Sequence, residues 1–231
     1  MLITSLDNPQ IKELIKLKCD KSYRDKENKY IVEGYHMVRL AYEKNLLIKC
    51  YSLNDDEELK PILINEKVLK KVSSVITPQG IIGIVKKDSI KNLTNKILYL
   101  DHIQDPGNMG TLLRTALAFG FKTIINDSSV DYYNEKVLRS TQGAIFSLNL
   151  LEGSIDDFDL KNYYIYSTDL KGKEIQKIEK KEKVVLILGN EGSGVREELK
   201  KRADQNLKIS IDEIESLNVS IAGGILMYEL K

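Results

Sequence analysis

The chain has 231 residues, 42% of them hydrophobic and 30% charged, and its 35 Lys+Arg against 34 Asp+Glu give a formal charge of +1. This composition is globular and excludes an intrinsically disordered or collagen-like chain. No apolar run approaches the roughly 20 residues of a membrane-spanning helix, so we expect no membrane partner. Near-neutrality also argues against a nucleic-acid binder, which usually carries a basic excess.

The first ninety residues have the pattern of a small α/β domain. Asn8 followed by Pro9 predicts a helix start, and the apolar spacing predicts a second helix over 34–44. Short apolar runs follow at 48–53, 62–64, 72–75 and 82–85. Helical and strand-like pieces therefore alternate, which predicts a domain over 1–90, with the polar stretch 86–95 as its linker.

The rest of the chain, 95–231, is predicted to form a second domain. Strand signals lie at 97–100, 123–125, 146–150, 163–166, 184–188 and 207–211, and helical patterns lie at 110–119, 135–140 and 195–201. This alternation predicts a mostly parallel sheet covered on both faces. A final apolar helix contains Ala222, Gly223 and Gly224, whose small size allows close approach of another backbone, in the core or in a subunit interface.

Charge is divided unevenly between the two halves. Residues 1–92 hold 17 basic and 13 acidic side chains, a formal +4, whereas residues 93–231 hold 18 and 21, a formal −3. The densest basic stretch, 16–29, is either a solvated surface or a phosphate-contacting patch. Cys19 and Cys50 have no C-x-x-C spacing, and no secretory signal is visible, so we expect two reduced thiols, no metal site and a cytoplasmic protein.

The first of three informative segments is 101–120. A strand is followed by a Pro-Gly turn and a helix, which we expect Asn108 to cap and Gly120 to end. Arg114 is the only charge along this helix. Such a strand–turn–helix presents polar groups beyond the carboxyl end of a parallel sheet, where ligands of open α/β folds bind. The alternative is an ordinary capped helix with a surface arginine.

The second segment, 184–195, is a five-residue apolar strand followed by Gly189, Gly192 and Gly194. Its glycine spacing fits neither a P-loop nor a dinucleotide fingerprint. Glu191 would repel phosphate and suits a cationic or hydroxyl-bearing ligand. The alternative is a tight structural turn.

The third segment, 207–230, runs from a strand through Ser216, Leu217 and Asn218 into the final helix. Burial of that helix explains its apolar residues. It does not explain the two polar residues at the junction.

Together these segments resemble the SpoU (TrmH-like) branch of the SPOUT methyltransferases. The resemblance covers roughly 95–231 and rests on Asn-x-Gly-x-x-x-Arg-x-Ala in the first segment, Gly-Asn-Glu-Gly in the second and Ser-Leu-Asn-Val-Ser in the third. Residues 1–90 are similar to the substrate-binding domain often fused to this branch, which has a ribosomal-protein-type RNA-binding fold. That similarity rests on Asn-Pro-Gln-Ile-Lys at 8–12, Tyr-Ile-Val-Glu-Gly at 30–34 and Thr-Pro-Gln-Gly at 77–80.

The resemblance implies an S-adenosylmethionine-dependent methyltransferase acting on a ribose 2′-OH of structured RNA, with 23S ribosomal RNA favoured over transfer RNA. It also implies a trefoil knot in the carboxyl-terminal sheet, which composition would never suggest because knots are so rare, and a homodimer. Two alternatives stay open. One is a non-catalytic RNA-binding or ribosome-assembly protein that keeps the knot, and the other is a base methyltransferase.

The same resemblance assigns roles to individual residues. Those carried over to the reaction are Arg114, Asn108, Glu191, Ser216 and Asn218, and those carried over to the cofactor are Gly189, Ile211 and Leu217. An arginine is an awkward base because its guanidinium stays charged, so we expect Arg114 to bind the target phosphate and stabilise the developing alkoxide. One departure from the family is the short acidic turn 212–215 beside the expected cofactor pocket. His36 and His102 match no catalytic position and are expected to be structural.

Overall fold

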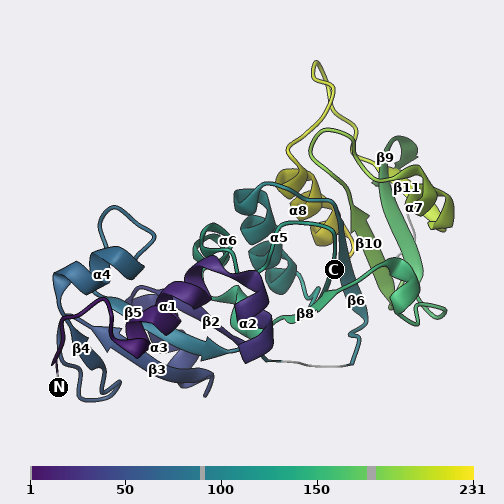
Figure 1. Ribbon diagram of the computed structural model, residues 1–231. Coiled ribbons are helices and arrows are strands. Elements are labelled where there is room, and N and C mark those ends of the chain that lie inside the picture. Colours follow the sequence, from purple (N-terminus) through teal and green to yellow (C-terminus); the bar gives the residue numbers. More distant parts are fainter. Residues whose placement is uncertain (1, 89–91, 176–180) are drawn as a thin grey trace. The chain divides into compact units, whose positions relative to one another are not determined.

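The computed structural model describes residues 2–88, 92–175 and 181–231 (Figure 1). The chain divides into two compact units. Unit 1 comprises Met1–Asp88 and Tyr133–Phe146, and unit 2 comprises Ser89–Tyr132 and Ser147–Lys231. The domain limits that the sequence predicts, 1–90 and 95–231, stay a prediction.

Unit 1 is a five-stranded mixed sheet with helices on both faces. Its elements are β1 (Leu2–Ile3), α1 (Pro9–Cys19), α2 (Lys21–Glu27), β2 (Lys29–Glu33), α3 (Tyr35–Glu43), β3 (Leu47–Ser52), β4 (Ile62–Ile64), α4 (Glu66–Val72), β5 (Ile81–Lys86) and, from the later segment, α6 (Glu135–Thr141) and the first part of the 3-10 turn η1 (Ala144–Ser147). The strand order is β1-β4-β3-β5-β2, parallel between β1, β4 and β3 and antiparallel where β5 joins β3 and β2.

Alternation along β5 decides which helix covers which face of this sheet. Ile82 and Ile84 pack in one cluster with α1 and α4, through Leu14 and Leu69 among others. Gly83 points the other way, and a Cβ there would come 3.2 Å from Val38 on α3. α1 and α4 therefore lie on one face of the sheet and α3 lies on the other, because successive residues of a strand point to opposite faces.

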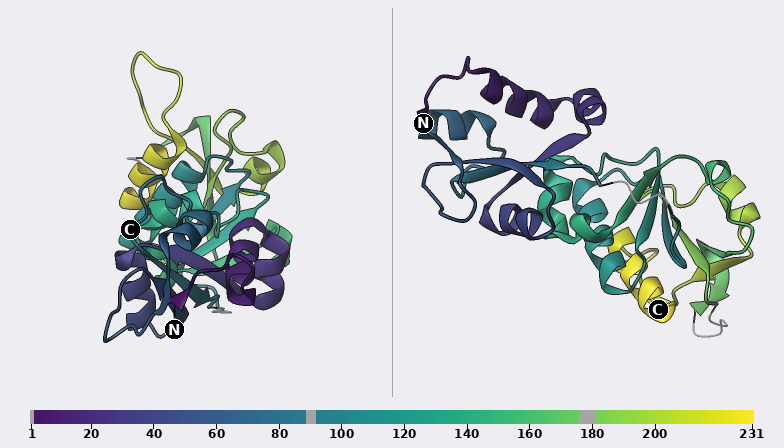
Figure 2. Two further views of the ribbon diagram at one scale, coloured as in Figure 1. Left: turned by 60° about the vertical axis from the view of Figure 1, so that its left-hand side comes forward. Right: turned by 90° about the horizontal axis from the view of Figure 1, so that it is seen from below.

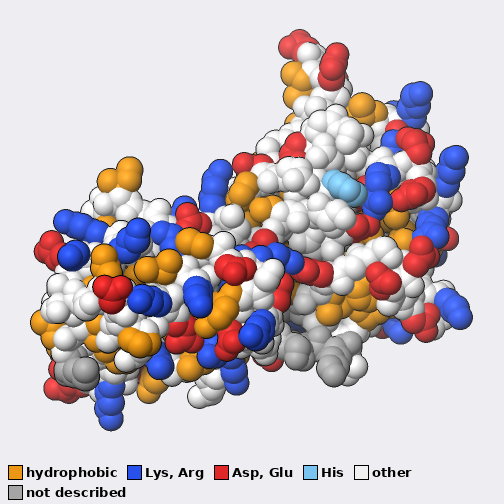
Figure 3. Space-filling model, viewed as in Figure 1, with side chains coloured by type: hydrophobic (Ala, Val, Ile, Leu, Met, Phe, Trp, Pro, Cys, Tyr) orange, Lys and Arg blue, Asp and Glu red, His pale blue; other side chains and the backbone are white. Residues whose placement is uncertain are grey.

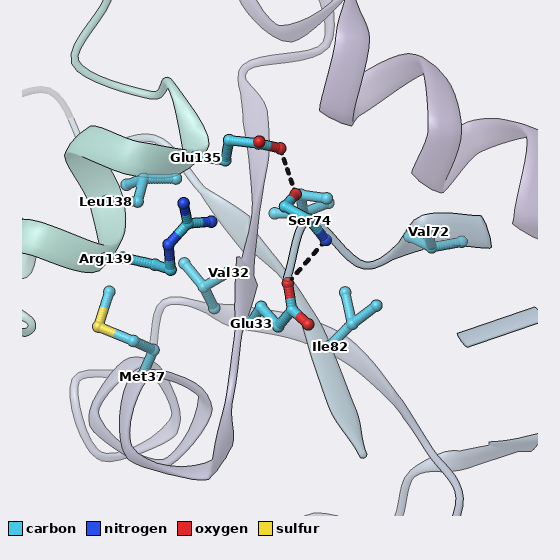
Figure 4. A pocket seen from close by; sticks show the side chains of 10 residues that line it. Val32, Glu33, Met37, Val72, Ser74, Ile82, Glu135, Leu138 and Arg139 are labelled. Carbon is cyan, nitrogen blue, oxygen red and sulfur yellow. Dashed lines mark hydrogen bonds between the residues drawn. The ribbon is translucent and has the colours of Figure 1, made fainter. Parts of the chain in front are cut away.

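α6 packs in unit 1 although it is distant in sequence from the other elements. Ser74 holds it there: its hydroxyl donates to Glu135 at the start of α6, and its backbone N–H donates to Glu33 Oε2 at 3.1 Å (Figure 4). Met37 and Leu138 line the same small cavity. The segment after β7 in unit 2 thus contributes a helix to unit 1.

Much of the basic stretch 16–29 is engaged inside unit 1. Arg24 is buried and donates through Nη1 to the Leu17 and Lys18 carbonyls at the end of α1. Lys18 donates to the Ser73 carbonyl at 2.7 Å, and Lys29 pairs with Glu13 at 3.4 Å. Figure 3 shows basic and acidic side chains intermixed on the visible face of unit 1. The stretch is therefore in large part structural, which weakens its interpretation as one phosphate-contacting patch.

Unit 2 is a six-stranded sheet in which every strand pair is parallel. Its elements are β6 (Lys96–Asp101), α5 (Pro106–Ala118), β7 (Thr123–Asp127), β8 (Asn149–Glu152), the 3-10 turn η2 (Ile155–Asp157), β9 (Tyr164–Glu174), β10 (Val184–Leu188), α7 (Glu197–Arg202), β11 (Gln205–Lys208) and α8 (Val219–Glu229). The strand order is β11-β9-β10-β6-β7-β8. The predicted parallel sheet is confirmed, whereas the trefoil knot stays a prediction.

The two faces of this sheet carry different helices (Figure 2). Tyr99 and Ile187 pack with Leu199 of α7 on one face. On the other face α8 lies against α5 and β10. The contact is so close that a Cβ on Gly223 would come 2.6 Å from side chains of both Leu112 and Leu188. The glycine therefore allows close packing within the unit.

Several of the predicted elements differ from the structure. The run 72–75 is not a strand, because Asn65 caps α4 and Val68, Leu69 and Val72 fall on its buried side. The run 146–150 is a 3-10 turn followed by β8, and β11 ends at Lys208, short of the predicted 207–211. Of the predicted linker 86–95, residues 89–91 lie outside the described part of the chain. No helix among the described residues has the length and apolarity to cross a membrane.

Candidate active site

The start of α5 differs from the sequence prediction in an informative way. Asp105, not Asn108, is the N-cap, and its Oδ1 accepts the Asn108 backbone N–H at 2.9 Å. A carboxylate at this position satisfies a helix N–H that lacks an intrahelical partner. Asn108 lies inside the first turn as a result, and its side chain is available for contacts beyond the helix.

Glu191, from the glycine loop after β10, is held against this first turn. Its Oε1 accepts the Asn108 side-chain amide at 3.1 Å and the Asp105 N–H at 3.0 Å, and its Oε2 accepts the Gln104 N–H at 3.1 Å. Burial raises the pKa of Glu191, but these hydrogen bonds outweigh burial and lower the pKa overall. The group is an ionised acceptor that fixes the loop, not a proton donor.

Asn218 joins the third segment to the other two. Its Nδ2 donates to Asn108 Oδ1 at 3.0 Å, while its Oδ1 caps α8 by accepting the Ser220 N–H at 2.9 Å. Glu191, Asn108 and Asn218 therefore form one hydrogen-bonded chain. The structure therefore brings together the three motif segments, although Asn108 and Asn218 are 110 positions apart in the sequence.

The glycine loop approaches itself so closely that only glycine fits at its start. A Cβ on Gly189 would come 2.2 Å from the Gly194 carbonyl carbon and the Val195 nitrogen, which are backbone atoms that cannot move aside cheaply. Asn190 closes the loop, since Oδ1 accepts the Gly192 and Ser193 N–H groups at 2.9 and 3.1 Å. This loop is thus rigid as well as exposed.

The remaining predicted residues lie around this chain. Arg114 is exposed on α5 and makes no hydrogen bond or ion pair with any described residue. Ser216 is exposed in the loop before α8, whose acidic tip is visible in Figure 3. Ile211 and Leu217 are half-buried in the same loop, and their backbone groups make no hydrogen bond within the described chain. Free main-chain donors and acceptors beside half-buried apolar side chains fit the adenosine part of S-adenosylmethionine.

A polar cluster beside this site was not predicted from the sequence. Asp101, at the end of β6, accepts Arg196 Nε at 2.7 Å and the Arg196 N–H at 2.9 Å, and Arg196 Nη2 also donates to Asp127 at the end of β7. Tyr99 donates to Asp127 at 2.5 Å. Burial raises the pKa of Asp127, but the bonds from Tyr99, Ser128 and Arg196 lower it overall. The sequence signal that could have revealed this cluster is the pair Asp101 and Asp127, which end two adjacent parallel strands.

The comparison with known families decides the identity. Residues 95–228, more than half of the chain, match the model of the SpoU rRNA Methylase family. This chain belongs to the SpoU rRNA Methylase family. Residues 8–83 match the MRM3-like substrate binding domain. The SpoU family member described here is therefore an S-adenosylmethionine-dependent RNA methyltransferase, and the resemblance stated from the three motifs is confirmed.

Individual proteins agree with this family membership. The 23S rRNA (guanosine(2553)-2′-O)-methyltransferase RlmP of Bacillus subtilis is 34% identical, over 99% of this chain and 98% of its own. The crystal structure of an rRNA methyltransferase from Sinorhizobium meliloti has a TM-score of 0.88 at 28% identity, covering 100% of this chain and 96% of that one. The crystal structure of an AdoMet-bound rRNA methyltransferase from Sinorhizobium meliloti has a TM-score of 0.87 at 28% identity, covering 100% of this chain and 97% of that one.

Proposed function

We propose that this SpoU family member transfers a methyl group from S-adenosylmethionine to a ribose 2′-OH of ribosomal RNA, with 23S rRNA favoured over transfer RNA. The observation that carries the proposal is the hydrogen-bonded chain Glu191–Asn108–Asn218, which joins the three motif segments in one site. The 2′-O-methyltransferase named for Bacillus subtilis, matched along almost the whole chain, supports this choice of target.

The proposed roles follow from where each residue lies. S-adenosylmethionine supplies an electrophilic sulfonium methyl group, and Gly189, Ile211 and Leu217 would hold it through backbone groups. The exposed, unpaired guanidinium of Arg114 would bind the target phosphate and stabilise the alkoxide that develops at the 2′-oxygen. Because an arginine keeps its proton near neutral pH, that phosphate would share in accepting the proton of the 2′-OH.

The hydrogen-bonded chain would serve to position the reactants. Glu191 fixes Asn108, and Asn108 orients the ribose or Arg114. Asn218 is held at the start of α8, and Ser216 lies two residues before it, where both would position substrate and cofactor. Alignment of the two reacting groups is the main task for this chemistry, since the methyl group is already activated.

The test uses purified protein, labelled S-adenosylmethionine and rRNA from cells that lack the enzyme. After digestion to nucleosides, mass spectrometry should find a 2′-O-methylnucleoside. A base-methylated nucleoside would instead support a base methyltransferase, and absence of cofactor binding by calorimetry would support a non-catalytic RNA-binding protein.

Arg114→Ala tests the residue assignment. We expect the methylation rate to fall about 100-fold or more, with unchanged cofactor affinity, because a charge contact to the reacting group is lost. The matched control is Arg202→Ala, which removes an exposed arginine of α7 that pairs with Asp156 at 2.8 Å. This variant should keep the wild-type methylation rate. Full activity in a folded Arg114→Ala variant would contradict the assignment.

We also propose that the protein is a homodimer in the cytoplasm, joined through α8. Ile221, Ile225 and Tyr228 form an apolar stripe at helical spacing, and they are 55%, 37% and 51% exposed. Ile225→Glu should shift the protein from dimer to monomer in sedimentation, whereas Leu170→Glu, on the exposed apolar side chain of β9, should not. A monomeric wild type, or a dimeric Ile225→Glu variant, would rule out this interface.

A further inference from the structure

An open hollow lies beside the proposed active site, at the carboxyl ends of β6 and β10. Its polar lining consists of Asp101, His102, Gln104, Asn190, Ser193 and Arg196. β6 and β10 are neighbours in the sheet at the place where the strand order reverses, and open parallel sheets bind ligands in the crevice outside such a point. Gln104 connects the hollow to the site, because its backbone N–H donates to Glu191.

His102 is fixed at the edge of the hollow in a backbone conformation that favours glycine, with φ of 59°. Its carbonyl accepts Asn190 Nδ2 at 2.9 Å and Gln104 Nε2 at 3.3 Å, and its N–H donates to the Asp127 carbonyl at 3.0 Å. Nδ1 lies 2.8 Å from the buried Asp101 carboxylate. Non-glycine residues held in this conformation by many contacts concentrate at functional sites.

Arg196 provides a flat surface in the same hollow. Asp101 and Asp127 hold the edges of its guanidinium, and Glu198 contacts Nη1 at 3.0 Å, while the side chain remains 38% exposed. The hydrogen bonds of a guanidinium lie in its plane. Its faces therefore stay available for stacking on a nucleobase, a use of arginine that is common in RNA recognition.

The residues that line the hollow also offer several hydrogen-bond acceptors. A carboxylate accepts hydrogen bonds, so His102 Nδ1 carries the hydrogen in the neutral ring and Nε2 is an acceptor without a partner in the described chain. Gln104 donates through Nε2 to two carbonyls, which leaves Oε1 as an acceptor. Ser193 Oγ donates to Asn190 and can accept. A base edge with adjacent donors matches such a set.

We propose that this hollow binds a nucleobase of the RNA substrate, stacked on Arg196 with its edge toward His102, and that it prefers guanine. Guanine alone among the four bases presents a ring N–H beside an amino group on its pairing edge. The inference rests on the proposed function, because it takes the substrate to be RNA.

Binding can be measured without methyl transfer. The chain has two histidines, so the imidazole NMR signals of His102 are assignable, with His36 in unit 1 as an internal reference. Titration with GMP should move the His102 signals saturably, more than AMP, CMP, UMP or IMP does, and ribose 5-phosphate should leave them in place. No shift with any nucleotide, or an equal shift with ribose 5-phosphate, would overturn the base site. A larger shift with another base would overturn the guanine preference.

His102→Gly removes the ring and suits the backbone conformation at this position. We expect the KM for rRNA to rise about tenfold, the scale of losing one hydrogen bond to the base, with a smaller change in kcat and unchanged S-adenosylmethionine affinity. Asn45→Gly is the matched control, since Asn45 is an exposed residue with φ of 57° that does not line the hollow. Equal KM values for the two variants, or loss of cofactor binding in His102→Gly, would show that His102 is only structural. Because the titration needs no methyl transfer, failure of the proposed activity would leave it interpretable.

Discussion

At the scale of single residues, Glu191 connects the parts of the site. Its carboxylate accepts two backbone N–H groups ahead of α5 and the side-chain amide of Asn108, so one ionised group orders both a loop and a positioning residue. Hydrogen bonds to a charged acceptor are stronger than neutral ones. Removing the charge should therefore disturb folding slightly and catalysis strongly.

Glu191→Gln tests this role. The replacement puts an amide NH₂ among N–H donors, so we expect the free energy of unfolding in urea to fall by about 1 kcal/mol. The methylation rate should fall about tenfold or more as Asn108 loses its orientation. Glu197→Gln, on an exposed side chain that pairs with Lys200 at 2.8 Å, is the control and should change neither quantity much. Wild-type activity in Glu191→Gln would remove Glu191 from the positioning network.

The lowered pKa of Glu191 predicts where pH affects this loop. A depressed carboxyl pKa contributes stability above the unfolded value, about 4.3, and the contribution is lost as pH falls through the folded value. The wild type should therefore lose more stability than Glu191→Gln between about pH 5 and 3. From pH 6 to 9 the difference in unfolding free energy between the two proteins should be constant. A difference that varies across that neutral range would contradict the assignment.

The residues proposed for the site were selected from sequence patterns, but the contacts between them could not be predicted in that way. The prediction that Asn108 caps α5 is wrong, because Asp105 three positions earlier is the cap and a cap and a first-turn residue look alike in sequence. The positioning role of Asn108 stays a prediction. The contact between Asn108 and Asn218 depends on how α5 and α8 pack, which no local pattern encodes. Arg196 and Asp101 pair across the sheet edge for the same reason.

At the scale of elements, α8 shows how one residue decides a packing distance. Gly223 faces Leu112 and Leu188, whereas a Cβ on the adjacent Gly224 would meet only Thr115, at an ordinary 3.7 Å. Gly223→Ala should lower the free energy of unfolding by about 1–2 kcal/mol, because overpacking outweighs the gain in helix propensity. Gly224→Ala should raise it by about 0.5–1 kcal/mol. Equal effects of the two substitutions in urea unfolding would contradict this packing.

Elements with strong local signals were predictable, and elements that depend on neighbours were not. Asn8 and Pro9 start α1 as expected, and β10 matches its apolar run. β9 extends to Glu174, well past the predicted 163–166, because β11 pairs with it and supplies backbone partners that its polar residues alone would not attract. The predicted strand over 72–75 overlaps the end of α4, because the apolar residues of α4 continue into the coil that follows it.

At the scale of the whole molecule, the near-zero charge hides a formal +4 on residues 1–92 and −3 on the rest. Ion pairs leave this excess unchanged, but they reduce the number of lysines in unit 1 that are free to bind phosphate, since Lys12 pairs with Asp7 and Lys87 with Asp25. RNA binding by few unpaired charges depends on RNA shape more than on bulk attraction. We therefore expect salt to weaken RNA binding by this protein less than it weakens RNA binding by a strongly basic protein.

This expectation can be measured as the slope of the RNA-binding constant against salt concentration. We expect log Kobs for rRNA binding to fall against log salt with a slope of about −2 to −4, well short of strongly basic binders. Lys16 is exposed, and its ammonium faces the Tyr23 ring at 5.4 Å with no carboxylate partner among the described residues, so Lys16→Gln should reduce the slope by about 0.9. Lys29→Gln removes the same charge from an ammonium that Glu13 already neutralises, and the slope should stay the same. If Lys29→Gln changed the slope as much as Lys16→Gln, net charge rather than unpaired charge would govern binding.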